Sequence, residues 1–337
     1  MVCLQICFDL EHSLVQDFRK VYMNDIQRVT AFAPATVANV AVGFDILGFP
    51  IHAAGDTVTL QRRSDRRIII TDITGVDGCQ DLPREPEKNV CSYVIQRLFF
   101  DQKVSFGVNI AIRKGIPLSS GMGGSAASSA AALTAANQLL QKPLSSIELL
   151  AYALLGEELA TGYPHGDNVT PCLFGGFTLL RSIDPLKVEQ LPVPENLTVA
   201  LVHPHKRLDT RLSREALGST FAIRDVTRQA ALLAGFIAGC YTNDLKLIGE
   251  SLEDVLVEPR RAPLIEGFSA VKEAALKAGA LGMSLSGSGP SVFALCDGAA
   301  RADRVKDAIV SVWEHMGIAS EAWSADISAS GAYVSEA

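Results

Sequence analysis

The chain has 337 residues, of which 48% are hydrophobic, 20% charged and 7% aromatic, as in an ordinary globular protein. The formal net charge of −7 argues against a nucleic-acid or anionic-membrane surface, so neither partner is expected. The seven cysteines are scattered without a Cys-x-x-Cys pair, and the six histidines lack metal-finger spacing. We therefore expect a reduced, cytoplasmic protein without structural zinc.

The N-terminal segment is expected to lie outside the folded domains. Asp9 and Glu11 interrupt its apolar run and no cleavage site follows, so a signal peptide is not expected. Met23 stands just before the first patterned segment, so residues 1–22 are either an extension or a mis-assigned start. We assign residues 1–28 to an N-terminal extension and leave its disorder open. No apolar segment reaches transmembrane length.

The first half of the chain combines β-rich segments with helices. Apolar residues alternate with period two over 104–115, which predicts a strand. Ser145 and Glu148 form a capping-box pattern, which predicts a helix N-terminus. The expected elements are a β-rich region over 29–60, a helix over 90–100, a strand over 104–115, helices over 126–140 and 145–160, and a glycine-broken strand over 171–182.

The second half begins after a change in composition. Residues 183–196 hold three prolines and are interpreted as a linker or domain edge. The elements expected after it are strands over 198–202 and 291–295, and helices near 213–217, 225–241, 244–257, 264–278 and 301–316. This irregular mixture predicts an α+β fold with two domains, 29–185 and 186–337.

The stretch Ile116–Asn137, IPLSSGMGGSAASSAAALTAAN, begins with a segment rich in glycine and serine, which have small side chains. It continues with a run of alanines, which are strong helix formers. A strand, a glycine-rich turn and a helix N-terminus together favour phosphate binding, because the free N–H groups and the helix dipole attract an anion. The loop lacks the Gly-Lys-Ser/Thr ending of a Walker A motif. Two alternatives stay open at this point: a close-packed structural turn, and the Gly-Ser signature of serine amidases, for which no upstream lysine is evident.

Two further motifs separate these interpretations. The pattern at 117–127 resembles the phosphate loop of the GHMP kinases, and APATVANVAVGFDILG (33–48) and GMSLSGSGPSVFAL (282–295) resemble their N-terminal and C-terminal motifs. All three occur in the family's order, and the resemblance covers residues 29–335. It implies an N-terminal ribosomal-protein-S5-like domain with a left-handed βαβ unit, which binds ATP, and a C-terminal ferredoxin-like domain.

Within the superfamily the chain resembles the homoserine kinases most. The supporting segments are GEELATGYPHGDNVTPCLFGGF (156–177), LDTRLSREALG (208–218) and VEPRRAPLIEGF (257–268). The resemblance implies ATP-dependent, Mg-assisted phosphorylation of the side-chain hydroxyl of L-homoserine for threonine synthesis. The alternatives are a GHMP kinase for another small alcohol, such as mevalonate or a sugar, and a catalytically silent GHMP-fold binding protein. Whether the chain forms a homodimer is left open.

The resemblance also implies roles for individual residues. Glu157 and Ser125 would hold Mg, and the family's usual serine is replaced here by Gly124. Asn168 stands where related GHMP kinases have an aspartate thought to act as base, so catalysis is expected to rest on positioning and charge neutralisation. Gly287, Ser288 and Gly289 would brace the phosphate loop. The residues expected to contact ATP are Pro117, Leu118, Ser119, Ser120, Gly121, Met122, Gly123, Gly124, Ser125, Ala126, Ala127 and, on the adenine side, Asn89.

The remaining matched residues would form a pocket for an amino acid. Such a ligand carries one cation and one carboxylate, so its pocket needs an acid and one or two arginines. Asp45 would face the ammonium group, and Arg214 and Arg261 the carboxylate. Without the resemblance, each of these charges could equally be a solvated surface group. The full set is Asn39, Asp45, His165, Asn168, Thr210, Arg214 and Arg261.

Overall fold

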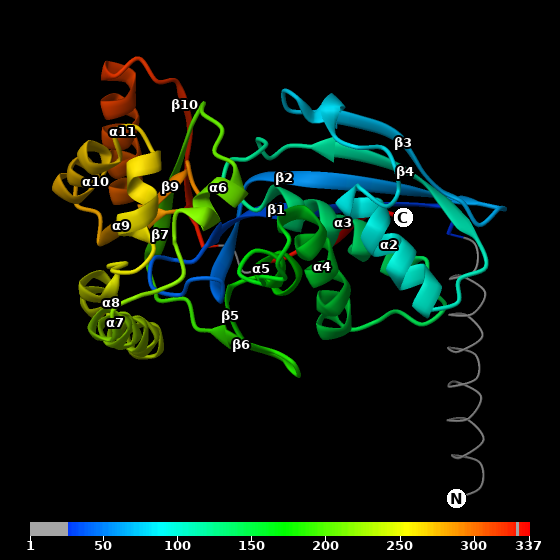
Figure 1. Cartoon of the computed structure of the whole chain (residues 1–337), viewed down its shortest axis with the longest axis horizontal. Helices are drawn as coiled ribbons and strands as arrows, with labels where there is room; N and C mark the ends of the chain where they lie inside the picture. The colour runs from blue at the N-terminus through cyan, green and yellow to red at the C-terminus, as the bar shows by residue number, and fades with distance from the viewer. Residues whose placement is uncertain (1–25, 328–329) are drawn as a thin grey trace, which may run out of the picture.

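The structure is a computed structural model that describes residues 26–327 and 330–337. The prediction for residues 1–22 lies outside the described residues, as does all but the end of the 1–28 extension. The described chain forms an α+β fold, as predicted, and its strands are arranged in two sheets (Figure 1). Among the helices of the described part, none is long and apolar enough to cross a membrane.

The first sheet has seven strands in the order β11-β1-β2-β4-β3, with β5 paired to β2 and β6 to β5. Helices α2, α3, α4 and α5 pack on it, and α3 lies directly against β1 and β2 (Figure 1). Strand β3, helix α2 and strand β4 form a parallel βαβ unit, whose handedness stays a prediction. The bounds are β1 Arg28–Ala38, β2 Leu47–Arg63, β3 Ile68–Gly75, η1 Cys79–Asp81, α2 Val90–Asp101, β4 Gly107–Lys114, α3 Gly124–Gln138, α4 Ser146–Thr161, α5 Val169–Phe174, β5 Phe177–Ile183, β6 Leu186–Leu191 and β11 Tyr333–Glu336.

The alanine-rich helix α3 is the central element of this half. Ten of its residues are buried, so it has no solvent face, and its small side chains allow the sheet, α2 and α4 to approach closely. The contact with α4 is tight: a Cβ on Gly156 would lie 2.5 Å from Ser129 Oγ. The small side chains of residues 116–137 therefore serve close packing along the helix as well as the turn before it.

The second sheet has four antiparallel strands in the order β10-β7-β9-β8. Helices α10 and α11 cover it, and Trp313 of α11 is fully buried in the core between these layers. Taken in chain order, the strands and these two helices give a βαββαβ arrangement, which is the predicted ferredoxin-like topology. The bounds are β7 Leu197–Pro204, α6 Thr210–Glu215, α7 Ile223–Thr242, α8 Leu245–Ser251, α9 Glu258–Arg261, η2 Ala262–Leu264, α10 Phe268–Lys277, β8 Gly282–Leu285, β9 Val292–Asp297, α11 Ala299–His315 and β10 Ser320–Asp326.

Most predicted elements are present, including the capping box of Ser145 and Glu148 at the start of α4. The single strand predicted over 171–182 is wrong, because its first part is helix α5 and only residues from Phe177 onward are strand. A short apolar run contains too few residues for its periodicity to distinguish a helical turn from a strand. The helix expected over 244–257 ends at Ser251.

The segment expected to be a linker is instead part of the first sheet. Residues 183–196 contain strand β6, which pairs antiparallel with β5. Strand β11 near the C-terminus also returns to this sheet beside β1. The predicted boundary at 185/186 therefore falls between two paired strands, and the division of the chain into 29–185 and 186–337 stays a prediction.

Candidate active site

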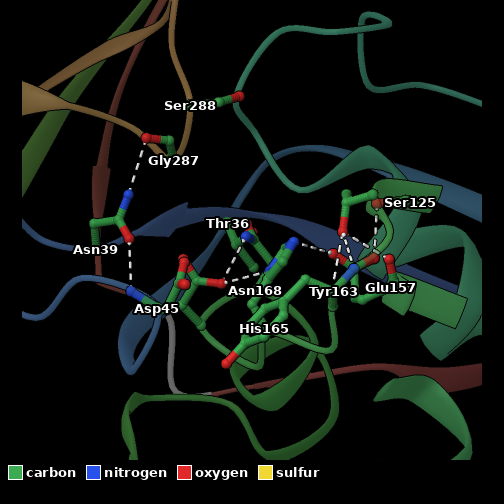
Figure 2. Close-up of polar contacts among 12 residues, drawn as sticks. Thr36, Asn39, Asp45, Ser125, Glu157, Tyr163, His165, Asn168, Gly287 and Ser288 are labelled. Atoms are coloured by element: carbon green, nitrogen blue, oxygen red, sulfur yellow. Dashed lines mark hydrogen bonds and ion pairs between the residues drawn. The ribbon is translucent and has the colours of Figure 1, made fainter. Parts of the chain in front are cut away.

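A cavity of about 520 Å³ is lined by residues from both halves of the chain. The first half contributes the phosphate loop and the end of α4, and the second half contributes α6, Arg261 of α9 and the 287–288 turn. Figure 2 shows the polar side chains from β1, α4 and the 163–168 loop that converge here. The predicted site residues that line the cavity are Asn39, Asp45, Asn89, Pro117, Leu118, Ser119, Ser120, Gly121, Gly123, Gly124, Ser125, Glu157, His165, Asn168, Thr210, Arg214, Arg261, Gly287 and Ser288.

The phosphate loop depends on two glycines in the left-handed region. Gly121 and Gly123 have φ of +77° and +71°. A Cβ on Gly121 would lie 2.4 Å from the carbonyl oxygen of Ser286, and one on Gly123 would lie 2.1 Å from Thr36 Oγ1. Helix α3 begins at Gly124, directly after the turn, so its first backbone N–H groups have no partner within the helix and are available to an anion.

Three residues of the predicted ATP-contacting loop do not line the cavity. Met122, Ala126 and Ala127 are fully buried in the core of the first half. The backbone carbonyl of Met122 accepts a hydrogen bond from the Thr36 amide, which ties the loop to β1. The C-terminal turn braces the same loop, because Ser286 Oγ donates to the Gly121 carbonyl at 2.8 Å.

Ser125 and Glu157 lie together at one side of the cavity (Figure 2). Ser125 Oγ donates to Glu157 Oε1 at 2.7 Å, and His165 Nε2 lies 3.6 Å from Glu157 Oε2. Burial raises the pKa of Glu157, against the opposing effects of His165 and Ser125. Burial also opposes a charge on His165, but the hydrogen bond and charge of Asp167, together with Glu157, raise its pKa to about 9.

This pair fits a magnesium ion. Mg²⁺ is usually held by one or two carboxylates together with substrate phosphates and water, and does not need a complete protein cage. Glu157 is 1% exposed yet faces the cavity beside a hydroxyl oxygen, so a cation there would offset the cost of its buried charge. Within residues 26–327 and 330–337, no group of three or more His, Cys, Asp or Glu could hold a metal ion unaided.

Asn168 is held at both ends of its amide (Figure 2). Thr36 Oγ1 donates to Asn168 Oδ1 at 2.7 Å, and Asn168 Nδ2 donates to Asp167 Oδ1 at 3.2 Å. Asp167 Oδ1 also lies 3.0 Å from His165 Nδ1. The amide is thus fixed in orientation beside the phosphate loop, where a Cβ on Gly123 would come within 2.7 Å of its oxygen.

Asp45 and Arg214 form an ion pair across the two halves of the chain. Arg214 Nη1 and Nη2 donate to the Asp45 carboxylate at 3.0–3.1 Å. Burial and the nearby charge of Asp167 raise the pKa of Asp45, while Arg214 lowers it. The resemblance implied that Asp45 faces the ammonium group of a ligand and Arg214 its carboxylate. In the structure the two side chains neutralise each other's charge.

Arg261 is the most buried arginine of the site, with 2% exposure. Its Nε donates to the Ser213 carbonyl at 3.0 Å and its Nη1 to the Gly287 carbonyl at 3.1 Å. Asn39 Nδ2 donates to the same Gly287 carbonyl, and Thr210 Oγ1 lies 3.3 Å from Ser288 Oγ. Arg261 therefore ties α6 to the 287–288 turn.

Asn89 has a structural role that accounts for its side chain. Its Oδ1 accepts from the Cys91 amide at 3.0 Å as the N-cap of α2, and its Nδ2 donates to the Pro83 carbonyl at 2.9 Å. It lines the cavity, but both ends of the amide are occupied by the protein.

A buried group beneath the phosphate loop was missed from the sequence. Lys114 Nζ forms a short ion pair with Asp56 and donates to the Gly124 carbonyl at 2.9 Å and to Ser128 Oγ at 2.8 Å. Asp56 is fully buried and Lys114 is 4% exposed. The one available signal was a charged residue at an inward-facing position of each of two strands. Thr36 was missed as well, since only its contact with Asn168 distinguishes it.

Comparison with known proteins places these motifs in one family. The GHMP kinases N terminal domain matches residues 88–176 and the GHMP kinases C terminal domain matches residues 236–315. A homoserine kinase from Chlorobium phaeovibrioides is 44% identical over 92% of this chain and its own full length. One from Xylella fastidiosa is 46% identical over 90% of this chain and 92% of its own. The crystal structure of homoserine kinase from Cytophaga hutchinsonii superposes with a TM-score of 0.89 at 44% identity, covering 92% of this chain and 98% of the other.

Proposed function

The chain belongs to the GHMP kinases and, among them, to the homoserine kinases, and we propose that it catalyses phosphoryl transfer by positioning and charge neutralisation, without an aspartate base. The reaction is the ATP-dependent phosphorylation of L-homoserine, which gives O-phospho-L-homoserine for threonine synthesis.

One observation carries the proposal: each carboxylate that lines the cavity already has a donor or cation. Asp45 is paired with Arg214, Asp167 accepts from His165 and Asn168, and Glu157 accepts from Ser125. Asn168 has an amide, which cannot take up the hydroxyl proton usefully. Phosphoryl transfer tolerates this arrangement, because its transition state depends on alignment and electrostatic support more than on a strong base.

We assign the phosphate-binding role to the backbone of residues 121–125 and the magnesium ligands to Glu157 and Ser125. When bound, Mg²⁺ would neutralise charge on the triphosphate. Asn168, locked by Thr36 and Asp167, would orient the homoserine hydroxyl toward the γ-phosphoryl group. The hydroxyl proton would leave late, to a phosphate oxygen or to water.

The ion pair of Asp45 and Arg214 supports recognition of a zwitterion. The α-ammonium group of homoserine matches Asp45, and its carboxylate matches Arg214. Binding would then replace one charge pair with two without leaving either side chain buried and unpaired. Arg261 contributes its buried positive charge and holds α6 in place.

We propose residues 29–185 as the nucleotide-binding domain and residues 186–337 as the C-terminal domain.

We propose that the protein is located in the cytoplasm. The described cysteines are all free and buried, which agrees with a reducing compartment.

Asp167→Asn tests the mechanism, because Asp167 is the carboxylate in contact with Asn168. A general base contributes roughly 10²–10⁴-fold to a rate. We expect kcat to fall by less than about 100-fold with the acidic limb of its pH profile retained, while loss of the Asp167 charge lowers the pKa of His165. A larger loss accompanied by disappearance of the acidic limb of the profile would identify Asp167 as a base and refute the proposal.

A further inference from the structure

The cavity is lined by five lysine and arginine side chains that differ in how far they are already engaged. Lys114 is paired with Asp56 and Arg214 with Asp45, and Arg261 donates to two backbone carbonyls. Lys88 lies 3.4 Å from Glu85. Within residues 26–327 and 330–337, the fifth, Arg207, hydrogen-bonds a single backbone carbonyl, that of Asp77.

Arg207 reaches across the cavity from the second half of the chain to the first. Its neighbour Leu208 donates its amide to the Ser119 carbonyl at 3.4 Å, so the main chain here lies against the phosphate loop. The guanidinium extends to the turn between β3 and η1, where Nη2 donates to the Asp77 carbonyl at 3.1 Å. A Cβ on Gly78 would come within 2.5 Å of Nη2, so the glycine leaves room for the guanidinium in this position.

This placement matches a need of the nucleotide site. ATP brings a highly charged triphosphate, and the phosphate loop offers it backbone N–H groups without a lysine of its own. The nearest buried lysine, Lys114, is committed to Asp56. A guanidinium carries five N–H donors in a planar fork suited to phosphate, and Arg207 uses one of them in the hydrogen bond to Asp77.

We propose that Arg207 donates to the polyphosphate of the bound nucleotide and closes the cavity over it from the second half of the chain. The inference rests on the proposed nucleotide site. It adds a phosphate-binding cation that none of the three GHMP motifs contains, since residue 207 lies outside 33–48, 117–127 and 282–295. The contact links nucleotide binding to the position of the loop that leads into α6, which carries Thr210 and Arg214.

The test compares Arg207→Ala and Arg207→Lys with wild type by calorimetric titration of ATP, ADP and AMP at fixed ionic strength. Arg211→Ala is the matched control, because Arg211 is 77% exposed, lies 3.9 Å from Glu215 and does not line the cavity. We expect Arg207→Ala to weaken ATP binding about 10-fold, Arg207→Lys about 3-fold, and neither to change AMP binding by more than about 2-fold. Arg211→Ala should bind all three nucleotides as wild type does.

Two results would overturn the proposal. If Arg207→Ala binds ATP as tightly as wild type, the guanidinium does not contact the polyphosphate. If it loses affinity for ATP and AMP equally, together with thermal stability, Arg207 is only a strap between the phosphate loop and the β3–η1 turn. Failure of the underlying function gives a different pattern: wild type itself would bind no ATP and release no ADP with homoserine.

Discussion

Replacing Gly123 by alanine adds one methyl group to the turn of the phosphate loop. The residue has φ of +71°, a region that costs an L-residue about 1–2 kcal/mol. The new Cβ would also stand 2.1 Å from Thr36 Oγ1 and 2.7 Å from Asn168 Oδ1, and these two atoms share a hydrogen bond. Displacing that bond costs a further ~0.5–1.5 kcal/mol. We therefore expect the free energy of unfolding to fall by about 1.5–3.5 kcal/mol.

The functional effect should exceed this loss of stability. Relief of the clash requires the loop to move, and the loop carries the N–H groups assigned to the triphosphate. ATP affinity should fall at least about 10-fold, or ~1.4 kcal/mol, and kcat should fall too because Asn168 is displaced. Urea unfolding, calorimetric ATP titration and steady-state rates measure the three quantities.

Gly124 provides the matched control. A Cβ there would lie 3.6 Å from its two nearest atoms, Ile116 Cγ2 and Lys114 Nζ, which is ordinary van der Waals contact, and the residue is the first of α3. Gly124→Ala should fold and bind ATP like wild type. If Gly123→Ala matches Gly124→Ala in stability and ATP affinity, the loop is only a structural turn and the reasoning is refuted.

Two further predictions concern the homoserine pocket and the second sheet. Arg214→Ala should raise the KM for homoserine about 10- to 100-fold, because a hydrogen bond to a charged group contributes ~1.5–3 kcal/mol, and should leave ATP affinity unchanged. Steady-state rates measured with each substrate varied in turn would check both expectations. An unchanged KM for homoserine would contradict the pocket assignment. Burial and the charge of His205 lower the pKa of His203 to about 4. His203 therefore takes up a proton near pH 6.5 in the unfolded chain but only near pH 4 in the folded protein. As the pH falls from 7 to 4, wild type should lose up to about 3 kcal/mol of stability that His203→Gln keeps; parallel urea-unfolding curves for the two proteins would contradict this.

The elements next to the phosphate loop could be predicted because their signals are local. A run of alanines after glycines fixes the start of α3 within two residues, and Ser145 with Glu148 fixes the start of α4. The order of motifs along the chain was enough to indicate the family. Helix α5 and strand β6 were not predictable, since their short apolar runs gain their conformation from pairing and packing with β5 and the first sheet.

The contacts within the site were harder to predict than its members. Asp45 and Arg214 were both identified, but their mutual ion pair joins residues 169 positions apart and depends on how α6 sits over the first half. Lys114 and Asp56 were missed because a charge at an inward-facing position of one strand does not identify its partner on the neighbouring strand. Asn89 has the sequence signature of a cap, and the cap is what it forms.

The central claim is tested most directly by coupled ADP release with L-homoserine, mevalonate, galactose and shikimate, each with and without Mg²⁺, and by ³¹P NMR of the product. We expect Mg²⁺-dependent ADP release with homoserine and with none of the other three alcohols. The product should carry a phosphate monoester on the side-chain oxygen of homoserine. Faster turnover of mevalonate or galactose, or no turnover of homoserine by folded, ATP-binding protein, would contradict it.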